Sequence, residues 1–284
     1  MKRKNKICAA ALICAMLLTL AACGTSESEL PDLSALGEIT VVAREDGSGT
    51  RSEFESIVDT DEDGANQVAF STEEVLELVQ SDVNAIGYLA YSALDETDVS
   101  GVTVLTANGI SCGSDTIADG SYALTREYIL AYSGSLSELE SDFITYIRGA
   151  GQEIVSQTCT PVRETAKFLS NGESGTITIT GSSSMETLMT QLIEGYAQYN
   201  PNAVIELEVT DSTDGLNAAM QGECDLAMSS RSLASYETEL LESYVIAADG
   251  IAVIVNAENP LTDISLSRLK TIYDGDVSVW GELE

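Results

Sequence analysis

The sequence contains no histidine among its 284 residues. Catalytic triads built on histidine and histidine-ligated metal sites are therefore excluded. Basic residues are also scarce, because 13 Lys and Arg stand against 46 Asp and Glu and give a formal net charge of −33. This balance argues against nucleic acid and anionic membrane surfaces as partners. It also prevents the overall field from attracting an anionic ligand, so an anion site must work through local donors.

Long apolar runs are missing from the chain after its N-terminal segment. That segment has basic residues at positions 2–6, an apolar stretch over 7–20 and then Leu20-Ala21-Ala22-Cys23. The last four residues resemble a bacterial lipobox. They predict a signal peptide over 1–22, cleavage before Cys23 and a lipid on its sulfur, which would hold the protein on the outer face of the cell membrane. An ordinary signal peptide or a short membrane anchor is the alternative, although the apolar stretch is short for a span.

Cysteine is also limited in the mature chain. Once the signal peptide and Cys23 are set aside, Cys112, Cys159 and Cys224 remain. Their number is odd and their spacing matches no metal motif. We expect them to be small buried hydrophobic residues, with one disulfide possible.

The segment Arg44–Arg51 connects an apolar strand-like run over 39–43 to a helix-like run over 51–58. Glycine on either side of Ser48 allows close backbone approach, and the first amides of a helix favour an anion. The hydroxyls of Ser48 and Thr50 add donors, and Arg44 adds a charged fork suited to an oxyanion. The segment therefore predicts half of an oxyanion site. The alternative is an ordinary helix N-cap in a surface loop.

Three further turns place hydroxyl groups where a strand-like run ends: 182–184, 212–213 and 229–231. Helix N-caps prefer Ser, Thr and Asp in any case, so a single such turn says little. Their repetition predicts that the donors converge on one anion.

Strand-like runs alternate with amphipathic helical patterns along the chain, which has the length of two modest domains. This alternation predicts an α/β fold with mostly parallel strands and ligands at their carboxyl ends. The composition of residues 171–175 predicts a linker.

The chain resembles the substrate-binding proteins of bacterial phosphate ABC transporters over nearly all of its mature length. The resemblance rests on the segments Arg44–Arg51, Ala85–Tyr88, Tyr122–Arg126, Thr180–Met185, Asp225–Arg231, Ala248–Asn256 and Leu269–Gly275 together with Trp280. It implies a class II clamp of the periplasmic-binding-protein type, in which each of two lobes is a mixed sheet flanked by helices. The ligand would lie between the lobes.

The segments occur in an unusual order, because the Arg44–Arg51 segment follows the Gly-Ser-Ser segment in the family and precedes it here. The chain is therefore interpreted as a circular permutation. It predicts a tether over 23–37, a second lobe from 38–117 plus 256–284, and a continuous first lobe over 118–255 that includes the linker. Strand 39–43 and a helix over 266–273 should share a lobe. A rearranged gene with a product that does not fold is the alternative.

The resemblance implies that the protein binds inorganic phosphate and delivers it to the permease subunits of an ABC importer. Asp46 would steady Arg44 or accept the proton of the ligand. Some relatives have an aspartate where Ser230 stands, which leaves selectivity against sulfate open, although Asp211 and Asp214 could compensate. The implied ligand residues are Arg44, Asp46, Ser48, Gly49, Thr50, Ser183, Ser184, Thr213 and Ser230.

No cofactor, metal or catalytic residue is predicted, and the protein is expected to be a monomer. An enzyme with Ser48 as nucleophile is one rival, but the sequence offers no evident base. The others are a binding protein for sulfate, molybdate or tungstate, and a phosphate sensor without a transport role.

Overall fold

The structure, a computed structural model, describes residues 30–94 and 99–283. The predicted signal peptide, Cys23 and the first part of the tether lie outside these residues. No helix within the two described ranges is long and apolar enough to cross a membrane.

Ten strands of the described chain form one sheet, along the path β2-β1-β3-β11-β6-β10-β8-β9, with β4 and β7 also paired to β11. A second sheet pairs β12 with β5. The strands are β1 (Thr40–Arg44), β2 (Gln67–Ala69), β3 (Ala85–Ala90), β4 (Val102–Val104), β5 (Thr106–Ala107), β6 (Thr125–Tyr132), β7 (Thr160–Pro161), β8 (Gly175–Ser182), β9 (Ala203–Thr210), β10 (Leu226–Ser229), β11 (Glu242–Asn256) and β12 (Asp263–Ile264).

The helices of the described residues flank this sheet. Most of them follow an N-cap residue that is Ser, Asp or Gly and has an extended backbone. They are α1 (Gly49–Val58), α2 (Thr72–Ser81), α3 (Ser114–Ala118), α4 (Glu138–Ile147), α5 (Gln152–Thr158), α6 (Glu186–Ala197), α7 (Ser212–Gln221), α8 (Ser235–Thr238) and α9 (Leu266–Tyr273). Short 3₁₀ turns cover Tyr91–Ala93, Ser183–Met185 and Trp280–Glu282.

The α/β fold class is confirmed, but the expectation of mostly parallel strands is wrong. Parallel pairs join β1 to β2 and β3, and β8 to β9 and β10. The long strand β11 runs antiparallel to β3, β4, β6 and β7. β11 continues over 15 residues as a single strand.

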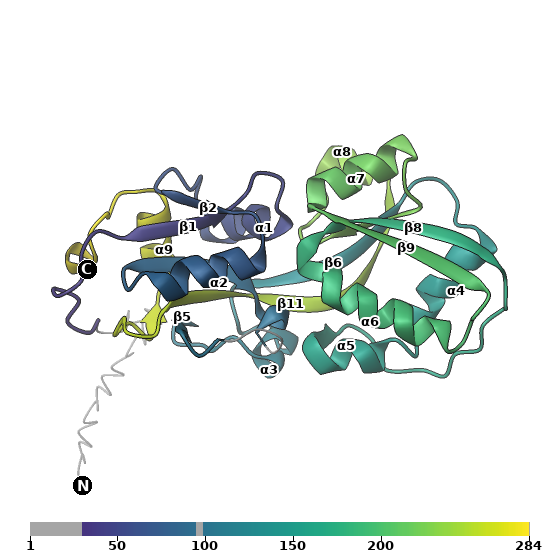
Figure 1. Ribbon diagram of the computed structural model, residues 1–284, viewed down its shortest axis with the longest axis horizontal. Helices are drawn as coiled ribbons and strands as arrows, with labels where there is room; N and C mark the ends of the chain where they lie inside the picture. The colour runs from purple at the N-terminus through teal and green to yellow at the C-terminus, as the bar shows by residue number, and fades with distance from the viewer. Residues whose placement is uncertain (1–29, 95–98, 284) are drawn as a thin grey trace, which may run out of the picture.

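Each of the two halves that Figure 1 shows side by side has a large hydrophobic cluster of its own. One half gathers both ends of the described chain, since β1 and α9 contribute Val41 and Leu269 to the same cluster. The other half is built from the middle of the chain around α4, α6 and β8. Strand 39–43 and helix 266–273, which the sequence placed together, therefore pack in one body.

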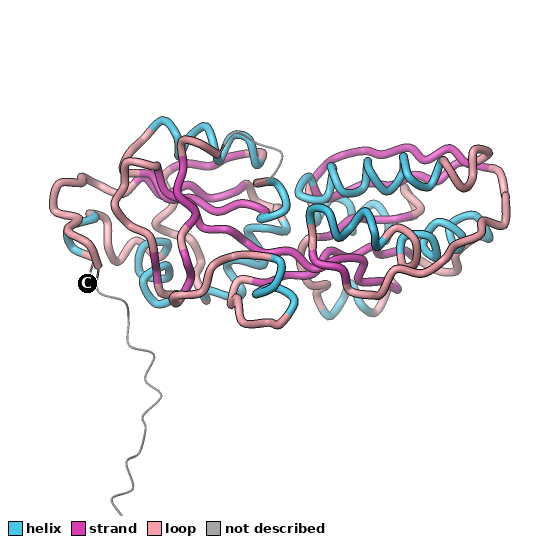
Figure 2. Tube along the Cα trace, turned by 90° about the horizontal axis from the view of Figure 1, so that it is seen from below, coloured by secondary structure: helices cyan, strands magenta, loops and turns pink. Residues whose placement is uncertain are grey.

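The strands β6 and β11 pass from one half into the other, and both views show strand as the connection (Figures 1 and 2). Tyr122, Leu124 and Ile251 belong to the cluster of the chain ends, although the sequence assigned them to the first lobe. The change of cluster falls near residue 125 on β6 and near residue 250 on β11. Because a continuous strand offers no loop at which to divide the chain, composition could not locate this point.

The last residues of the predicted tether belong to the folded body. Leu33 is buried in the cluster of the chain ends, and Leu30 and Leu36 pack against it. A backbone bridge pairs Glu38 with Val279, so the first and last described segments lie side by side. Chain ends that lie close together are compatible with a circular permutation, because the two ends can be joined without disturbing the fold.

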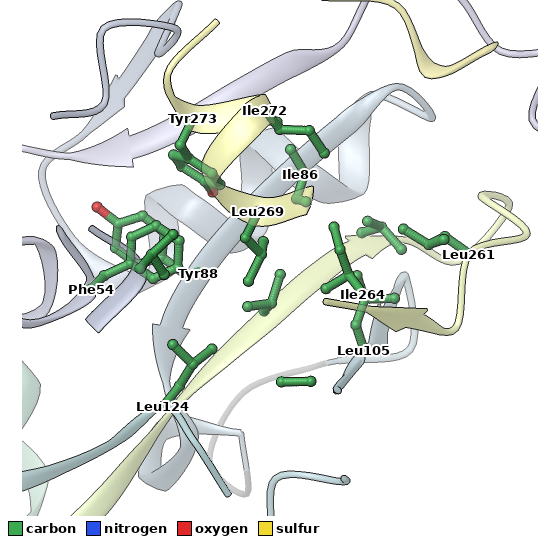
Figure 3. Packing of buried hydrophobic residues seen from close by; sticks show 14 of the residues in the cluster. Phe54, Ile86, Tyr88, Leu105, Leu124, Leu261, Ile264, Leu269, Ile272 and Tyr273 are labelled. Carbon is green, nitrogen blue, oxygen red and sulfur yellow. The ribbon is translucent and has the colours of Figure 1, made fainter. Parts of the chain in front are cut away.

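Three aromatic residues pack together at one side of the same cluster (Figure 3). The rings of Phe54 and Tyr88 stack with centroids 4.1 Å apart, and Tyr273 meets Phe54 edge-on at 4.8 Å. Beside them, the side chain of Glu62 is fully buried and lies 3.2 Å from Nε of Arg51. Burial raises the pKa of Glu62 to about 8, although the Tyr88 hydroxyl and Arg51 favour its charged form.

Glu62 should therefore make stability fall as the pH rises. Its pKa is 4.5 in an unfolded chain and about 8 in the folded one, so its contribution is complete below pH 4.5 and is lost on approaching pH 8. Relative to Glu62→Gln, the wild type should lose about 2–4 kcal/mol of unfolding free energy between pH 5 and pH 8. Urea unfolding at the two pH values measures this difference.

Glu55→Gln is the matched control, because Glu55 contacts the same Nε of Arg51 at 2.7 Å but is 29% exposed. It should keep most of the pH dependence of the wild type, because the Glu55 charge contributes less to the raised pKa of Glu62 than burial does. An identical pH dependence in wild type and Glu62→Gln would contradict the assignment.

Candidate anion-binding site

The turn between β1 and α1 has the backbone that the sequence predicted. Gly47 adopts a φ of 90°, which a residue with a side chain reaches only with strain. Ser48 is the N-cap of α1, and its hydroxyl accepts a hydrogen bond from the amide of Arg51 at 3.4 Å. The N-terminus of α1 lies against the other half of the molecule, and a helix N-terminus favours an anion.

Arg44 ends β1 with its side chain 1% exposed. Its Nε and Nη2 donate to the two carboxylate oxygens of Glu45 at 2.7 and 2.8 Å. Nη2 also reaches the hydroxyl of Ser183 in the other half, at 3.3 Å. Nη1 is buried and has no hydrogen-bond partner among the described residues. A charged donor that is buried without a partner is costly, so this group is available to an anionic ligand.

A second contact, between two hydroxyls, joins the halves beside Arg44. The oxygens of Thr50 and Ser184 lie 2.8 Å apart, and Nη1 of Arg126 donates to the Thr50 oxygen at 2.6 Å. Because the guanidinium can only donate, the Thr50 oxygen accepts from Arg126. Either hydroxyl of the Thr50–Ser184 pair can donate to the other. Arg126 and Ser184 therefore hold Thr50 in a row of hydroxyls that could donate to a ligand.

Arg126 is held by a carboxylate that lies within the crossing strands. Its Nη2 lies 2.9 Å from Asp249 of β11, and both side chains are fully buried. Asp249 also accepts from the Tyr128 hydroxyl at 2.7 Å and from the Ser92 amide at 2.9 Å. Burial raises the pKa of Tyr128 well above its usual value, so this hydroxyl stays protonated and donates. The ion pair links the hydroxyl row to the strands that connect the halves.

The remaining hydroxyls come from the turns at the ends of β8 and β10 and at the start of α7. Ser182 donates to Ser230 at 2.8 Å, and Ser230 lies 3.4 Å from the oxygen of Ser212. Thr213 donates through its hydroxyl and its amide to the Gly47 carbonyl, at 3.2 and 3.3 Å. The hydroxyl-bearing turns that the sequence singled out thus meet in space around the β1–α1 turn.

Gly49 permits this close approach. A Cβ added there would lie 2.2 Å from the Ser212 oxygen and 2.6 Å from the Ser230 oxygen, both in the other half. Gly49→Ala should therefore hold the halves apart and weaken anion binding by about tenfold or more, which titration calorimetry can measure. The fold should remain, because alanine suits a helix start better than glycine does.

Gly113→Ala is the matched control. Gly113 is the N-cap of α3, and a Cβ added there would meet only the Thr116 hydroxyl oxygen, at 3.8 Å. Its affinity should match that of the wild type. Unchanged binding in Gly49→Ala would show that the halves do not need to approach at this point.

Asp46 takes a position different from the expected one. Its side chain is 98% exposed and contacts Nη1 of Arg51 at 2.8 Å. It contacts neither Arg44 nor the hydroxyls, because the turn at Gly47 directs it outward; Glu45 is the residue that steadies Arg44. Asp211 caps α7 by accepting from the Asp214 amide at 2.8 Å, which matches an ordinary role as an N-cap.

The sequence interpretation missed Glu45, Arg126 and Asp249 as parts of the site, and it included Ser182 and Ser212 only as members of the hydroxyl-bearing turns. One pattern could have revealed two of them. Arg126 and Asp249 each interrupt an apolar strand, and a charge in such a place needs a partner. The pairing itself depends on two strands that are more than a hundred residues apart in the sequence.

Two small cavities lie where the halves meet. One of about 150 Å³ is lined by residues that include Ser92, Ser183 and Ser184. Another, of about 360 Å³, extends from Glu45 and Ser183 toward Asp211.

The described residues hold no group of three or more acidic, His or Cys side chains placed to bind a metal. Cys112, Cys159 and Cys224 are free thiols. The chemistry available here is donation of hydrogen bonds to an oxyanion.

Comparison with known proteins gives consistent results. A family model described as a PBP superfamily domain matches residues 25–149 and 167–283. Phosphate-binding protein PstS 2 of Streptococcus pneumoniae is 34% identical over 278 residues, which is 93% of this chain and 94% of that protein. A crystal structure of a phosphate-binding protein of a phosphate ABC transporter from Streptococcus pneumoniae aligns with a TM-score of 0.72 and 34% identity, covering 87% of this chain and 100% of that one.

The order of segments is shared with the pneumococcal protein, because one continuous alignment covers nearly all of both chains. The unusual order is therefore not a rearrangement peculiar to this chain. Phosphate-binding protein PstS of Bacillus subtilis is 31% identical over only 113 residues, 39% of this chain. A partial match of this kind agrees with a permuted order, which stays a prediction.

Proposed function

We propose that this chain, which belongs to the PBP superfamily and within it to the PstS phosphate-binding proteins, binds inorganic phosphate between its two halves and delivers it to an ABC importer. The buried Nη1 of Arg44 carries the proposal, because it is a charged donor with no partner among the described residues. It lies beside hydroxyls that come from both halves. The names of the full-length relatives support phosphate as the oxyanion.

The two halves would act as the lobes of a clamp. Their boundaries would follow the predicted second lobe (38–117 plus 256–284) and first lobe (118–255), moved to the change of cluster on β6 and β11. Phosphate would contact donors on both lobes and so favour the closed state. The proposed ligand residues are Arg44, Ser48, Gly49, Thr50, Ser183, Ser184, Thr213 and Ser230.

Titration calorimetry of the mature protein with phosphate, sulfate and molybdate tests the ligand. We expect phosphate to bind with a stoichiometry of one and more tightly than sulfate. Tight molybdate binding without phosphate binding would reject phosphate as the ligand. Ser230 makes this comparison informative, because a buried hydroxyl can accept or donate, whereas a carboxylate would accept only.

No observation favours catalysis at Ser48. Its hydroxyl accepts from the Arg51 amide, as an N-cap does, and the relatives are named as binding proteins. We propose a monomeric binding protein without a cofactor.

We also propose that a lipid on Cys23 anchors the protein outside the cell membrane. The support is the Leu20–Cys23 pattern and the start of the family match at residue 25, just after the expected cleavage point. Mass spectrometry of the protein extracted from membranes should detect acyl groups on an N-terminal Cys23. An intact N-terminus, or cleavage elsewhere, would reject the anchor.

A further inference from the structure

An open pocket of about 830 Å³ lies outside the clamp, between the end of α4 and the extended segment 162–168. Its lining includes Arg148, Arg163 and Lys167. Part of its wall lies outside the match to the family model, which stops at residue 149 and resumes at residue 167. The role of the clamp does not account for this pocket.

The pocket gathers an unusual share of the positive charge. Of 13 Lys and Arg residues, four lie within positions 1–6, so nine remain in the rest of a chain with net charge −33. Three of the nine line this one pocket. In the described part of the chain none of the three has a carboxylate within ion-pair distance, whereas Arg44, Arg51, Arg126, Arg231 and Lys270 are all paired. Glu164 is the acidic residue of the lining.

Arg148 is fixed in a way that suits ligand binding. Its guanidinium lies over the ring of Tyr244, 4.2 Å from the centroid. Its Nε is buried and has no hydrogen-bond partner among the described residues. A guanidinium that stacks on a ring keeps its edge for donation, and an edge with an unused donor suits a carboxylate or phosphate group.

Arg148 also follows α4, where a cation interacts favourably with the helix dipole. That role explains a charge at this position. It does not explain Arg163 and Lys167, which stand exposed on a segment without regular structure and yet line the same pocket.

We propose that this pocket is a second anion site, which binds a small molecule with at least two phosphate or carboxylate groups. Its volume lies within the range of pockets for organic ligands, and the clustered cations would offset the repulsion from the acidic surface. Salt should weaken the binding, because two of the three cations are exposed to solvent.

Titration of the mature protein with pyrophosphate tests the proposal, in the presence of just enough inorganic phosphate to fill the clamp. We expect one pyrophosphate to bind, and Arg163→Gln/Lys167→Gln to weaken it by about tenfold or more. Both side chains are exposed, so this variant should unfold at the temperature of the wild type.

Lys270→Gln is the control for loss of a positive charge, since Lys270 is exposed and belongs to the opposite half. It should leave the pyrophosphate affinity within about twofold of wild type. Absence of pyrophosphate binding, or equal affinity in wild type and the Arg163→Gln/Lys167→Gln variant, would overturn the proposal. Pyrophosphate that bound in the clamp instead would not respond to this remote variant, so the two sites can be told apart.

Discussion

Arg44→Ala is expected to weaken phosphate binding by at least about 100-fold, within the ~2–5 kcal/mol that truncating one partner of a buried charge pair costs. Two effects add. The ligand loses the unused Nη1 donor, and the Glu45 carboxylate loses its bidentate partner beside an arriving anion. Titration calorimetry measures the affinity, and circular dichroism establishes that the fold persists.

Glu45 separates the two effects. In Arg44→Ala/Glu45→Ala the unpaired carboxylate is gone, so part of the lost affinity should return. Lys270→Ala removes one positive charge from an exposed ion pair and should bind phosphate as the wild type does. If Arg44→Ala bound phosphate normally, the site would lie elsewhere.

Asp249→Asn is expected to lower the free energy of unfolding by about 3–5 kcal/mol, because it leaves the buried Arg126 charge without a counterion. Asp249 and Arg126 are both fully buried, and the carboxylate also accepts bonds from Tyr128 and Ser92. Urea unfolding followed by circular dichroism measures the change. Since Asp249 lies on the strand that crosses between the halves, phosphate binding should weaken as well.

Two further variants distinguish the loss of a buried counterion from the loss of an exposed ion pair. Arg126→Met/Asp249→Leu replaces the pair by apolar side chains and should be much more stable than Asp249→Asn, because no charge stays buried alone. Lys270→Gln breaks an exposed ion pair and should change stability little. A loss below about 1 kcal/mol in Asp249→Asn would show that water reaches Arg126 and that the pair is not the support inferred here.

Local sequence was sufficient for the turn at residues 44–51. Glycine at 47 and 49 and a serine between them determine a tight turn and a capped helix, whatever surrounds them. The amphipathic pattern over 266–273 located α9 with its observed ends. These features depend on contacts between near neighbours, so a sequence pattern can reveal them.

The contacts of charged side chains could not be predicted from local sequence. Asp46 and Glu45 are adjacent acidic residues in one turn, and only the folded backbone directs one outward and the other to Arg44. The pair of Arg126 with Asp249 likewise depends on the register of β6 against β11. A sequence supplies the charges, but it does not state which distant charges meet.

The sequence by itself determined that an anion site in this protein would have to work through local donors, because a net charge of −33 cannot attract an anion. It also identified the hydroxyl-bearing turns that are proposed for this site. The tertiary structure decided that these turns meet, that Arg126 donates to the Thr50 hydroxyl beside them, and that Arg148, Arg163 and Lys167 share a pocket. The physical reason is that hydrogen bonds and ion pairs act over a few ångströms, a distance fixed by chain topology and not by separation along the sequence.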